Sequence, residues 1–163
     1  MKVALFMGSE SDFDVAKEAI KIFKEFEVPF AVEVTSAHRT PERTVRLVKD
    51  LEDQGVELFI ALAGKAAHLG GVVAAHTLRP VIGVPIGGPA LAGMDALFST
   101  VQMPKGIPVA TMGIGKSGAA NAALLAVQIL ALKDDTLRAK LDAFRKTMAA
   151  QVEQNSNNIK EFM

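Results

Sequence analysis

Three residue types are missing from this chain of 163 residues: cysteine, tryptophan and tyrosine. Without cysteine there are no disulfides and no thiolate metal ligands, which suits a reducing compartment. Without tryptophan or tyrosine, the chain lacks the large aromatic side chains that stack on nucleic-acid bases or sandwich an isoalloxazine ring. We therefore expect neither a nucleic-acid-binding protein nor a flavin-dependent electron carrier.

Neither positive nor negative charge is in excess. Lysine plus arginine number 18 and aspartate plus glutamate number 18, so no net field attracts nucleic acid or an anionic membrane. The longest apolar run, residues 119–132, contains Asn121 and Gln128 and is too short to span a bilayer. Met1 leads directly into a strand-like run, which leaves no room for a signal peptide. We expect a cytoplasmic protein that does not contact membranes.

What the sequence does contain is a regular alternation of strand-like and helix-like segments. Near-continuous apolar or alternating runs predict strands at residues 3–7, 30–35, 57–63, 81–85 and 109–114. Apolar residues at helical spacing fill the gaps, with stripes in residues 16–26 and 45–51 and further helices at 66–77, 94–103 and 117–133. This alternation, with right-handed crossovers, predicts an α/β fold: a flavodoxin-like three-layer sandwich around one five-stranded parallel sheet in the order 2-1-3-4-5.

A last helix is predicted at about residues 135–163. It carries one apolar stripe, formed by Leu137, Leu141, Phe144, Met148 and Val152. Half of the chain is hydrophobic, and we expect such a stripe to avoid water by packing on a neighbouring subunit. No linker or repeat interrupts the chain, so residues 1–163 are predicted to form a single domain.

In this fold class, ligands bind at the carboxyl ends of the strands, so the loops there are the candidate site. The first is GSESD, residues 8–12. Gly8 permits close backbone approach, while hydroxyls and helix N-terminal amides suit a phosphate and Asp12 suits a ribose diol. The same loop is equally an ordinary helix cap, with Ser11 capping and acidic residues near the helix N-terminus.

The second loop is SAHR, residues 36–39, followed by Thr40 and Pro41 as the predicted cap and first residue of a helix. Arg39 carries the planar fork that matches a phosphate. His38 is of the residue type that titrates near neutrality and transfers protons. A solvated surface pair is the alternative, but the position at a strand end favours a functional role.

The third loop is GKAAHLGG, residues 64–71, whose small residues let a substrate lie against the backbone. Lys65 fits a solvated lysine as well as a functional one, and His68 fits a backbone-bonded histidine at a helix start as well as a site residue. For His76 a structural or surface role is favoured. The sequence has no HExxH or comparable ligand set, so we predict no metal site.

Together these motifs resemble the PurE family across nearly the whole chain, in order: GSESD, SAHRTP, GKAAHLGG, LAGMDALFSTVQMPKGIPVAT and GAANAALLAVQIL. The resemblance implies an enzyme of de novo purine biosynthesis that interconverts N5-carboxyaminoimidazole ribonucleotide and 4-carboxy-5-aminoimidazole ribonucleotide. It also implies no metal or cofactor, a small-molecule nucleotide and CO2 as partners, and a homo-octamer. A direct CO2-dependent aminoimidazole ribonucleotide carboxylase and a catalytically silent nucleotide-binding module stay open as alternatives.

The resemblance also assigns residues. His38 is implied as the general acid/base, while Ser9, Asp12 and Arg39 are implied to bind the phosphate and ribose. His68 belongs to the loop that lines the pocket for the base and the carboxylate. The full set of substrate-binding residues implied in this way is Gly8, Ser9, Ser11, Asp12, Ser36, Ala37, Arg39, Gly64, Lys65, Ala66, His68 and Leu69.

Two positions depart from the family pattern, which usually reads GGAAHLPG in the third loop. Lys65 replaces the second glycine and Gly70 replaces the proline. The second class of the family, which carboxylates aminoimidazole ribonucleotide directly, has an arginine at the position of Lys65. SAHRTP and VQMPKG favour the first class, the mutases. If the replaced glycine had a positive φ, Lys65 reaches it only with strain.

Overall fold

The structure, a computed structural model, describes residues 1–162. It contains two compact units, Met1–Ala126 and a second that begins at Val127. The single domain expected from the sequence stays a prediction. Within the described residues, no helix is both long enough and apolar enough to cross a membrane.

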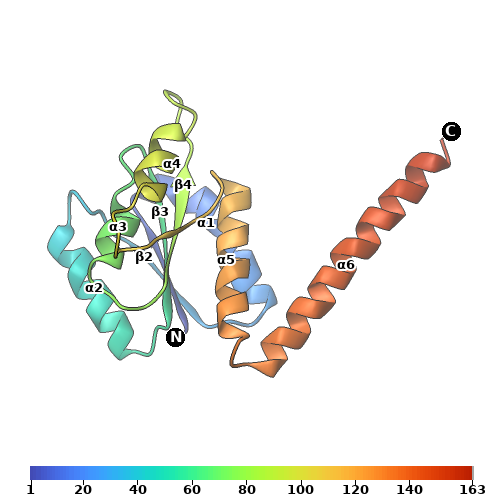
Figure 1. The fold of residues 1–163 in the computed structure, drawn as a ribbon, viewed down its shortest axis with the longest axis horizontal. Coiled ribbons are helices and arrows are strands. Elements are labelled where there is room, and N and C mark those ends of the chain that lie inside the picture. Colours follow the sequence, from blue (N-terminus) through green and yellow to red (C-terminus); the bar gives the residue numbers. More distant parts are fainter. Residues whose placement is uncertain (163) are drawn as a thin grey trace. The chain divides into compact units, whose positions relative to one another are not determined.

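The first unit is built on a parallel sheet of five strands (Figure 1). The strands are β1 (Val3–Met7), β2 (Phe30–Val34), β3 (Leu58–Gly64), β4 (Val81–Ile86) and β5 (Ala110–Thr111). Their order is β2-β1-β3-β4-β5, and every neighbouring pair is parallel. The predicted fold is confirmed. Because all strands run the same way, the loops after β1, β2 and β3 meet at one edge of the sheet.

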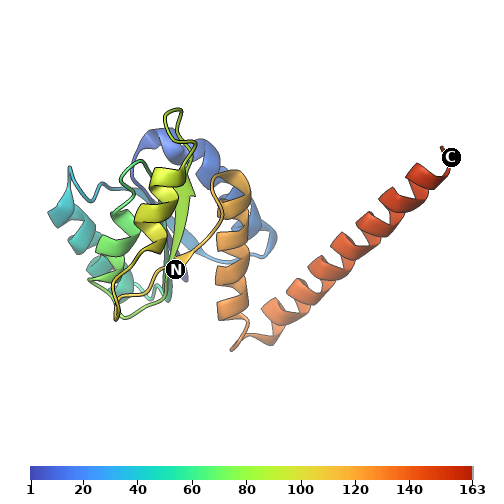
Figure 2. The same ribbon diagram turned by 45° about the horizontal axis from the view of Figure 1, so that its top comes forward.

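Helices lie on both faces of this sheet (Figures 1 and 2). In chain order they are the 3-10 helix η1 (Glu10–Asp12), α1 (Phe13–Glu25), α2 (Pro41–Asp53), α3 (Leu69–Ala74), α4 (Met94–Val101) and α5 (Lys116–Leu130). Alternate residues of each strand point to opposite faces. Phe6 and Phe59, edge to face at 5.6 Å between ring centroids, belong to the core cluster that includes Val48 of α2, Val73 of α3 and Ala96 of α4.

The other face of the sheet has its own aromatic contact. Phe23 of α1 is fully buried and lies 5.4 Å from Phe30 of β2, centroid to centroid. Ala16 and Ala19 are buried on the same helix, as the predicted stripe requires. Burying this apolar surface is the main stabilisation of the three-layer arrangement, at about 25 cal/mol per Å² removed from water. The sheet edge that carries the loops is thereby fixed on a rigid scaffold.

The second unit contains α6 (Asp135–Lys160). The Asp134 side chain caps the helix by accepting a hydrogen bond from the Leu137 N–H. None of the described α6 residues is buried, and Met148 and Val152 of the predicted apolar stripe are 55% and 68% exposed. The prediction that this stripe packs on a neighbouring subunit stays a prediction. The predicted helix ran to Met163, which lies outside the described residues.

The predicted boundaries hold to within three residues, but two predicted elements are much shorter in the structure. The predicted strand at 109–114 is only Ala110–Thr111, because it is the edge strand and Gly113 and Gly115 follow it, the latter with a φ of 78°. The predicted helix at 66–77 is only Leu69–Ala74. It starts late because Lys65 has a positive φ and the His68 N–H donates to Ala66 O in a tight turn.

Candidate active site

The loops after β1, β2 and β3 line an open cavity of about 500 Å³. Each loop contributes a group of neighbouring residues, and together they are Gly8, Ser9, Ser11, Asp12, Ser36, Ala37, His38, Arg39, Ala63, Gly64, Lys65, Ala66, His68 and Leu69. Every residue that the sequence proposed for the site lines this cavity, while the roles assigned to them stay predictions. Ala63 alone was missed, because it lies within the buried strand β3 and carries no polar group.

The first loop is held by a reciprocal capping box. The Ser9 hydroxyl accepts a hydrogen bond from the Ser11 N–H at 3.3 Å, and the Asp12 carboxylate accepts one from the Ser9 N–H at 3.1 Å. The helix-cap interpretation therefore describes this loop, with Ser9 in the capping position that had been assigned to Ser11. The Ser11 hydroxyl donates to Ser9 Oγ at 3.0 Å. Both hydroxyls thus lie together on the cavity wall.

Asp12 is the buried charged residue of the cavity, with 7% of its surface exposed. Burial raises the pKa of this carboxyl above its ordinary 3.8, and hydrogen bonds from Ser9 and Ser11 and the positive charge of Arg39 offset part of that rise. A ligand hydroxyl that donates to Asp12 would replace solvation that burial has removed. This is the chemistry expected of a residue that holds a sugar diol.

In the second loop, Arg39 reaches back over the first. Its Nη2 donates to Gly8 O at 2.9 Å and its Nε donates to Ser36 Oγ at 3.4 Å. The Arg39 backbone N–H also donates to Ser36 Oγ, at 3.2 Å. A guanidinium has five N–H donors, so three remain for an anion in the cavity. Arg39 and the two serine hydroxyls form a surface that suits a phosphate.

His38 and His68 form a pair across the second and third loops. His38 Nε2 and His68 Nδ1 are 2.8 Å apart, and the rings meet edge to face at 4.9 Å between centroids. A hydrogen bond between these two nitrogens uses one proton, and His38 Nδ1 and His68 Nε2 lie outside it. The alternative of a His68 side chain bonded to backbone is wrong. His76 instead lies outside the cavity, with its Nδ1 2.8 Å from Val72 O, in the structural role favoured for it.

The third loop departs from ordinary backbone geometry at Lys65. Its φ is 56°, the left-handed region, as expected if the residue replaces a glycine that needed a positive φ. The Lys65 side chain is exposed at the cavity wall. On the far side of the loop, Ser99 Oγ of α4 accepts a hydrogen bond from the Ala67 N–H at 2.9 Å. This contact ties the loop to α4.

The second departure, Gly70, has a different setting. It lies within α3, and a side chain there would meet Val109 and Ala61 at ordinary contact distances of 3.5 and 3.8 Å. The backbone at this position does not require glycine. Gly70 does not line the cavity, whereas Lys65 does. Of the two departures from the family pattern, Lys65 is therefore the one that can act on a ligand directly.

The cavity combines hydroxyls, a buried carboxyl, a guanidinium and a pair of imidazoles. Among the described residues, no group of three or more histidine, aspartate or glutamate side chains is placed to hold a metal ion. The prediction that the protein uses no metal stays a prediction. What the cavity offers is anion binding and proton transfer by side chains.

A flavodoxin-like sheet with these groups at its carboxyl edge is typical of α/β proteins that bind phosphorylated small molecules. Comparison with known proteins identifies the family within this class. Residues 2–151 match the family described as AIR carboxylase, and the chain belongs to that family.

Named relatives cover nearly the whole chain. It is 51% identical over 154 residues to N5-carboxyaminoimidazole ribonucleotide mutase of Escherichia coli. The aligned residues cover 94% of this chain and 91% of the relative. It is 50% identical over 159 residues to the protein of the same name from Methanocaldococcus jannaschii, covering 98% of each. Among solved structures, Treponema denticola PurE superposes with a TM-score of 0.88 at 29% identity, covering 96% of each chain.

Proposed function

We propose that this protein is an N5-carboxyaminoimidazole ribonucleotide mutase, an isomerase that moves a carboxyl group from the exocyclic nitrogen to C4 of the imidazole ring. The observation that carries the proposal is the identity of about half of all residues with proteins named for that activity, over nearly the full length of both chains. The direct carboxylase is not favoured, since these relatives are named as mutases. The imidazole pair beside anion-binding groups supports an enzyme over a silent binding module.

The nucleotide is proposed to bind with its phosphate against Arg39 and the hydroxyls of Ser9 and Ser11. Asp12 would accept hydrogen bonds from the ribose diol. Ser36 holds the guanidinium of Arg39 and so supports the phosphate contact indirectly. Small residues of the third loop, such as Gly64 and Ala66, would leave room for the base against the backbone.

The proposed reaction uses His38 twice. The bond between the exocyclic nitrogen and its carboxylate breaks to release CO2, and His38 gives a proton to the aminoimidazole as this bond breaks. The ring carbon C4 then attacks the trapped CO2, and His38 takes the C4 proton to restore aromaticity. Protons balance, because His38 gives one and receives one. His68, bonded to His38, is placed to share the proton between these two steps.

The protein is also proposed to act as a cytoplasmic homo-oligomer, an octamer by resemblance to the family, without metal or cofactor. The exposed apolar side chains of α6 support assembly, since a stripe with Met148 and Val152 exposed is a poor surface to leave in water. Light scattering at micromolar concentration tests this. A monomer there would contradict the proposed assembly but not the proposed reaction.

The proposed reaction is tested by adding the purified protein to N5-carboxyaminoimidazole ribonucleotide without ATP, metal or bicarbonate. We expect 4-carboxy-5-aminoimidazole ribonucleotide to form, with the C4 proton signal of the substrate lost from its NMR spectrum. Formation of the product only when bicarbonate is supplied with aminoimidazole ribonucleotide would identify a direct carboxylase instead. Binding without turnover under either condition would identify a silent module.

A further inference from the structure

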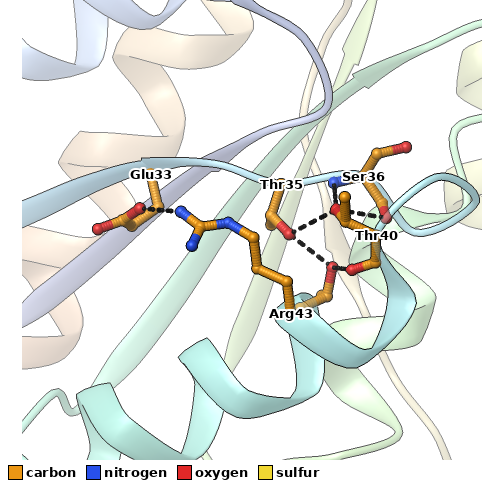
Figure 3. A network of polar contacts seen from close by, with 6 residues as sticks. Glu33, Thr35, Ser36, Thr40 and Arg43 are labelled. Carbon is orange, nitrogen blue, oxygen red and sulfur yellow. Dashed lines mark hydrogen bonds and ion pairs between the residues drawn. The ribbon is translucent and has the colours of Figure 1, made fainter.

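The turn that carries His38 and Arg39 is closed by Thr40. The Thr40 N–H and Oγ1 both donate to Ser36 O, at 2.9 and 3.2 Å, while Thr40 Oγ1 accepts from the Ser36 N–H at 3.0 Å. These three hydrogen bonds fix the two ends of the turn to each other. Figure 3 shows Ser36 and Thr40 next to each other. Thr40 is the N-cap residue of α2 and Pro41 its first residue, as predicted. The Thr40 hydroxyl closes the turn, however, and makes no capping hydrogen bond.

Two buried threonines lie directly beneath this closure. Thr35, the residue after β2, is 2% exposed, and Thr44, in the first turn of α2, is fully buried. Their hydroxyl oxygens are 2.7 Å apart, and Thr35 Oγ1 is 3.4 Å from Thr40 Oγ1. Figure 3 shows Thr35 and Thr40 facing one another between the strand and the helix.

Each of the three hydroxyl protons has a place. Thr44 donates to Thr40 O at 3.2 Å, and Thr40 donates to Ser36 O. The short contact between Thr35 and Thr44 is then made by the Thr35 proton, with Thr44 Oγ1 as acceptor. The order of donation runs from Thr35 to Thr44, to the carbonyl of Thr40, and through the Thr40 hydroxyl to the carbonyl of Ser36. The reverse order, in which Thr44 donates to Thr35 and Thr35 donates to Thr40 Oγ1 at 3.4 Å, connects the same three hydroxyls.

The Thr35 end of this series of hydrogen bonds is fixed to the sheet. The Thr35 N–H donates to Met7 O of β1 at 2.9 Å. Arg43 Nη2 and Glu33 Oε2, 2.8 Å apart, form a further link between α2 and β2, but both side chains are partly exposed. Exposed ion pairs contribute little to stability, so the buried hydroxyls are the specific connection. The turn is thereby fixed to β1, an interior strand of the sheet.

We propose that Thr44 and Thr35 are positioning residues, which set the location of the His38 imidazole through the Thr40 closure without touching the substrate. The proposal rests on the function proposed above for its effect on turnover. His38 depends on this support most, because among the described residues its side chain has a hydrogen bond to His68 alone. Arg39 has anchors of its own on Gly8 O and Ser36 Oγ. Loss of the buried hydroxyls should therefore impair proton transfer more than nucleotide binding.

The test is Thr44→Val, which keeps the shape of the side chain and removes the hydroxyl. Small displacements of a reacting group cost up to about a hundredfold in rate, so we expect kcat to fall by about tenfold or more. The dissociation constant of 4-carboxy-5-aminoimidazole ribonucleotide should change by less than about threefold, because the Arg39 contacts remain. Thr44→Ser restores the hydroxyl and should recover most of the lost kcat.

The chain offers a matched control in Thr100→Val. Thr100 is also a buried helical threonine, 5% exposed, and its hydroxyl donates to the carbonyl four residues earlier, Ala96 O, at 2.7 Å. It lies outside the cavity. Thr44→Val removes two hydrogen bonds, to Thr35 Oγ1 and Thr40 O, and Thr100→Val removes one, to Ala96 O. Both variants should therefore unfold at a lower urea concentration than the wild type, and only Thr44→Val should lose kcat.

A second readout does not depend on catalysis. In the unliganded protein, Thr44→Val should shift the imidazole 1H–15N NMR signals of His38 and its hydrogen-bonded partner His68, and Thr100→Val should leave them in place. Wild-type kcat and unshifted imidazole signals in Thr44→Val would overturn the proposal, as would an equal loss of kcat in Thr100→Val. If Thr44→Val does not fold, Thr35→Val is measured in the same way. If the wild-type protein has no mutase activity, the proposed function fails while the imidazole signals still decide the positioning role.

Discussion

Replacing Lys65 by glycine separates a backbone effect from a charge effect at the position where this chain departs most clearly from its family. Lys65 has a φ of 56°. A left-handed conformation costs a residue with a Cβ about 1 to 2 kcal/mol relative to glycine. The greater freedom of glycine in the unfolded chain costs about 0.5 to 1 kcal/mol. Lys65→Gly should therefore leave stability nearly unchanged or raise it, by about 0.5 kcal/mol on these magnitudes.

The matched control is Lys49→Gly, at an exposed position inside α2. Glycine in a helix interior costs about 1 kcal/mol, so urea denaturation should separate the two variants by about 1.5 kcal/mol. Equal destabilisation by both substitutions would refute the claim that Lys65 is held in a strained conformation.

The same variant tests the charge. An ammonium about 4 Å from a substrate carboxylate in a solvated setting contributes about 1 kcal/mol, or about fivefold in affinity. We expect Lys65→Gly to weaken the binding of both carboxylated nucleotides by about that factor and to leave the binding of aminoimidazole ribonucleotide unchanged. The ratio of mutase activity to direct CO2-dependent carboxylation should also change. An unchanged ratio and unchanged affinities would mean that the side chain points away from the reacting groups.

Three further substitutions test the site. His38→Asn should abolish turnover while nucleotide binding stays within about tenfold, because the phosphate and ribose contacts remain; near-normal turnover would remove the acid/base role. Arg39→Ala should weaken binding of the nucleotide far more than binding of its dephosphorylated nucleoside, as measured by calorimetry. An equal loss of affinity for both would place the guanidinium away from the phosphate. Asp12→Asn tests a pH effect. The folded-state pKa of Asp12 is raised above the ordinary 3.8, so its stability contribution is greatest below that value and is lost as pH rises through the folded-state pKa. Urea denaturation should show the wild-type protein losing stability relative to Asp12→Asn over that interval, and a difference independent of pH would contradict the raised pKa.

The sequence predicted which loops form the site because one rule connects strand order to ligand position. Apolar strands identified the sheet, and the loops with GSESD, SAHR and GKAAH followed from it. The rule gives no side-chain contacts between loops. His38 and His68 are 30 positions apart, and nothing in the local pattern around either residue predicts a hydrogen bond between them.

Other details were not predictable, for local reasons. Thr40 occupies the predicted N-cap position of α2, but a threonine hydroxyl can either cap the helix or close the turn to Ser36, and residue type does not distinguish the two. The start of α3 was misplaced because the positive φ of Lys65 turns the chain before a helix can begin. Backbone strain at a non-glycine residue is set by the surrounding fold, and residue propensities cannot reveal it.

The central claim is that one carboxyl group leaves the nitrogen and is recaptured at C4 within the same site. N5-carboxyaminoimidazole ribonucleotide labelled with 13C in its carboxylate, incubated with the wild-type protein in excess unlabelled bicarbonate, tests it by 13C NMR. The account predicts that 4-carboxy-5-aminoimidazole ribonucleotide forms with the label retained on the C4 carboxylate at early times. Product that carries unlabelled carboxylate from the first turnovers, or no product at all, would contradict it.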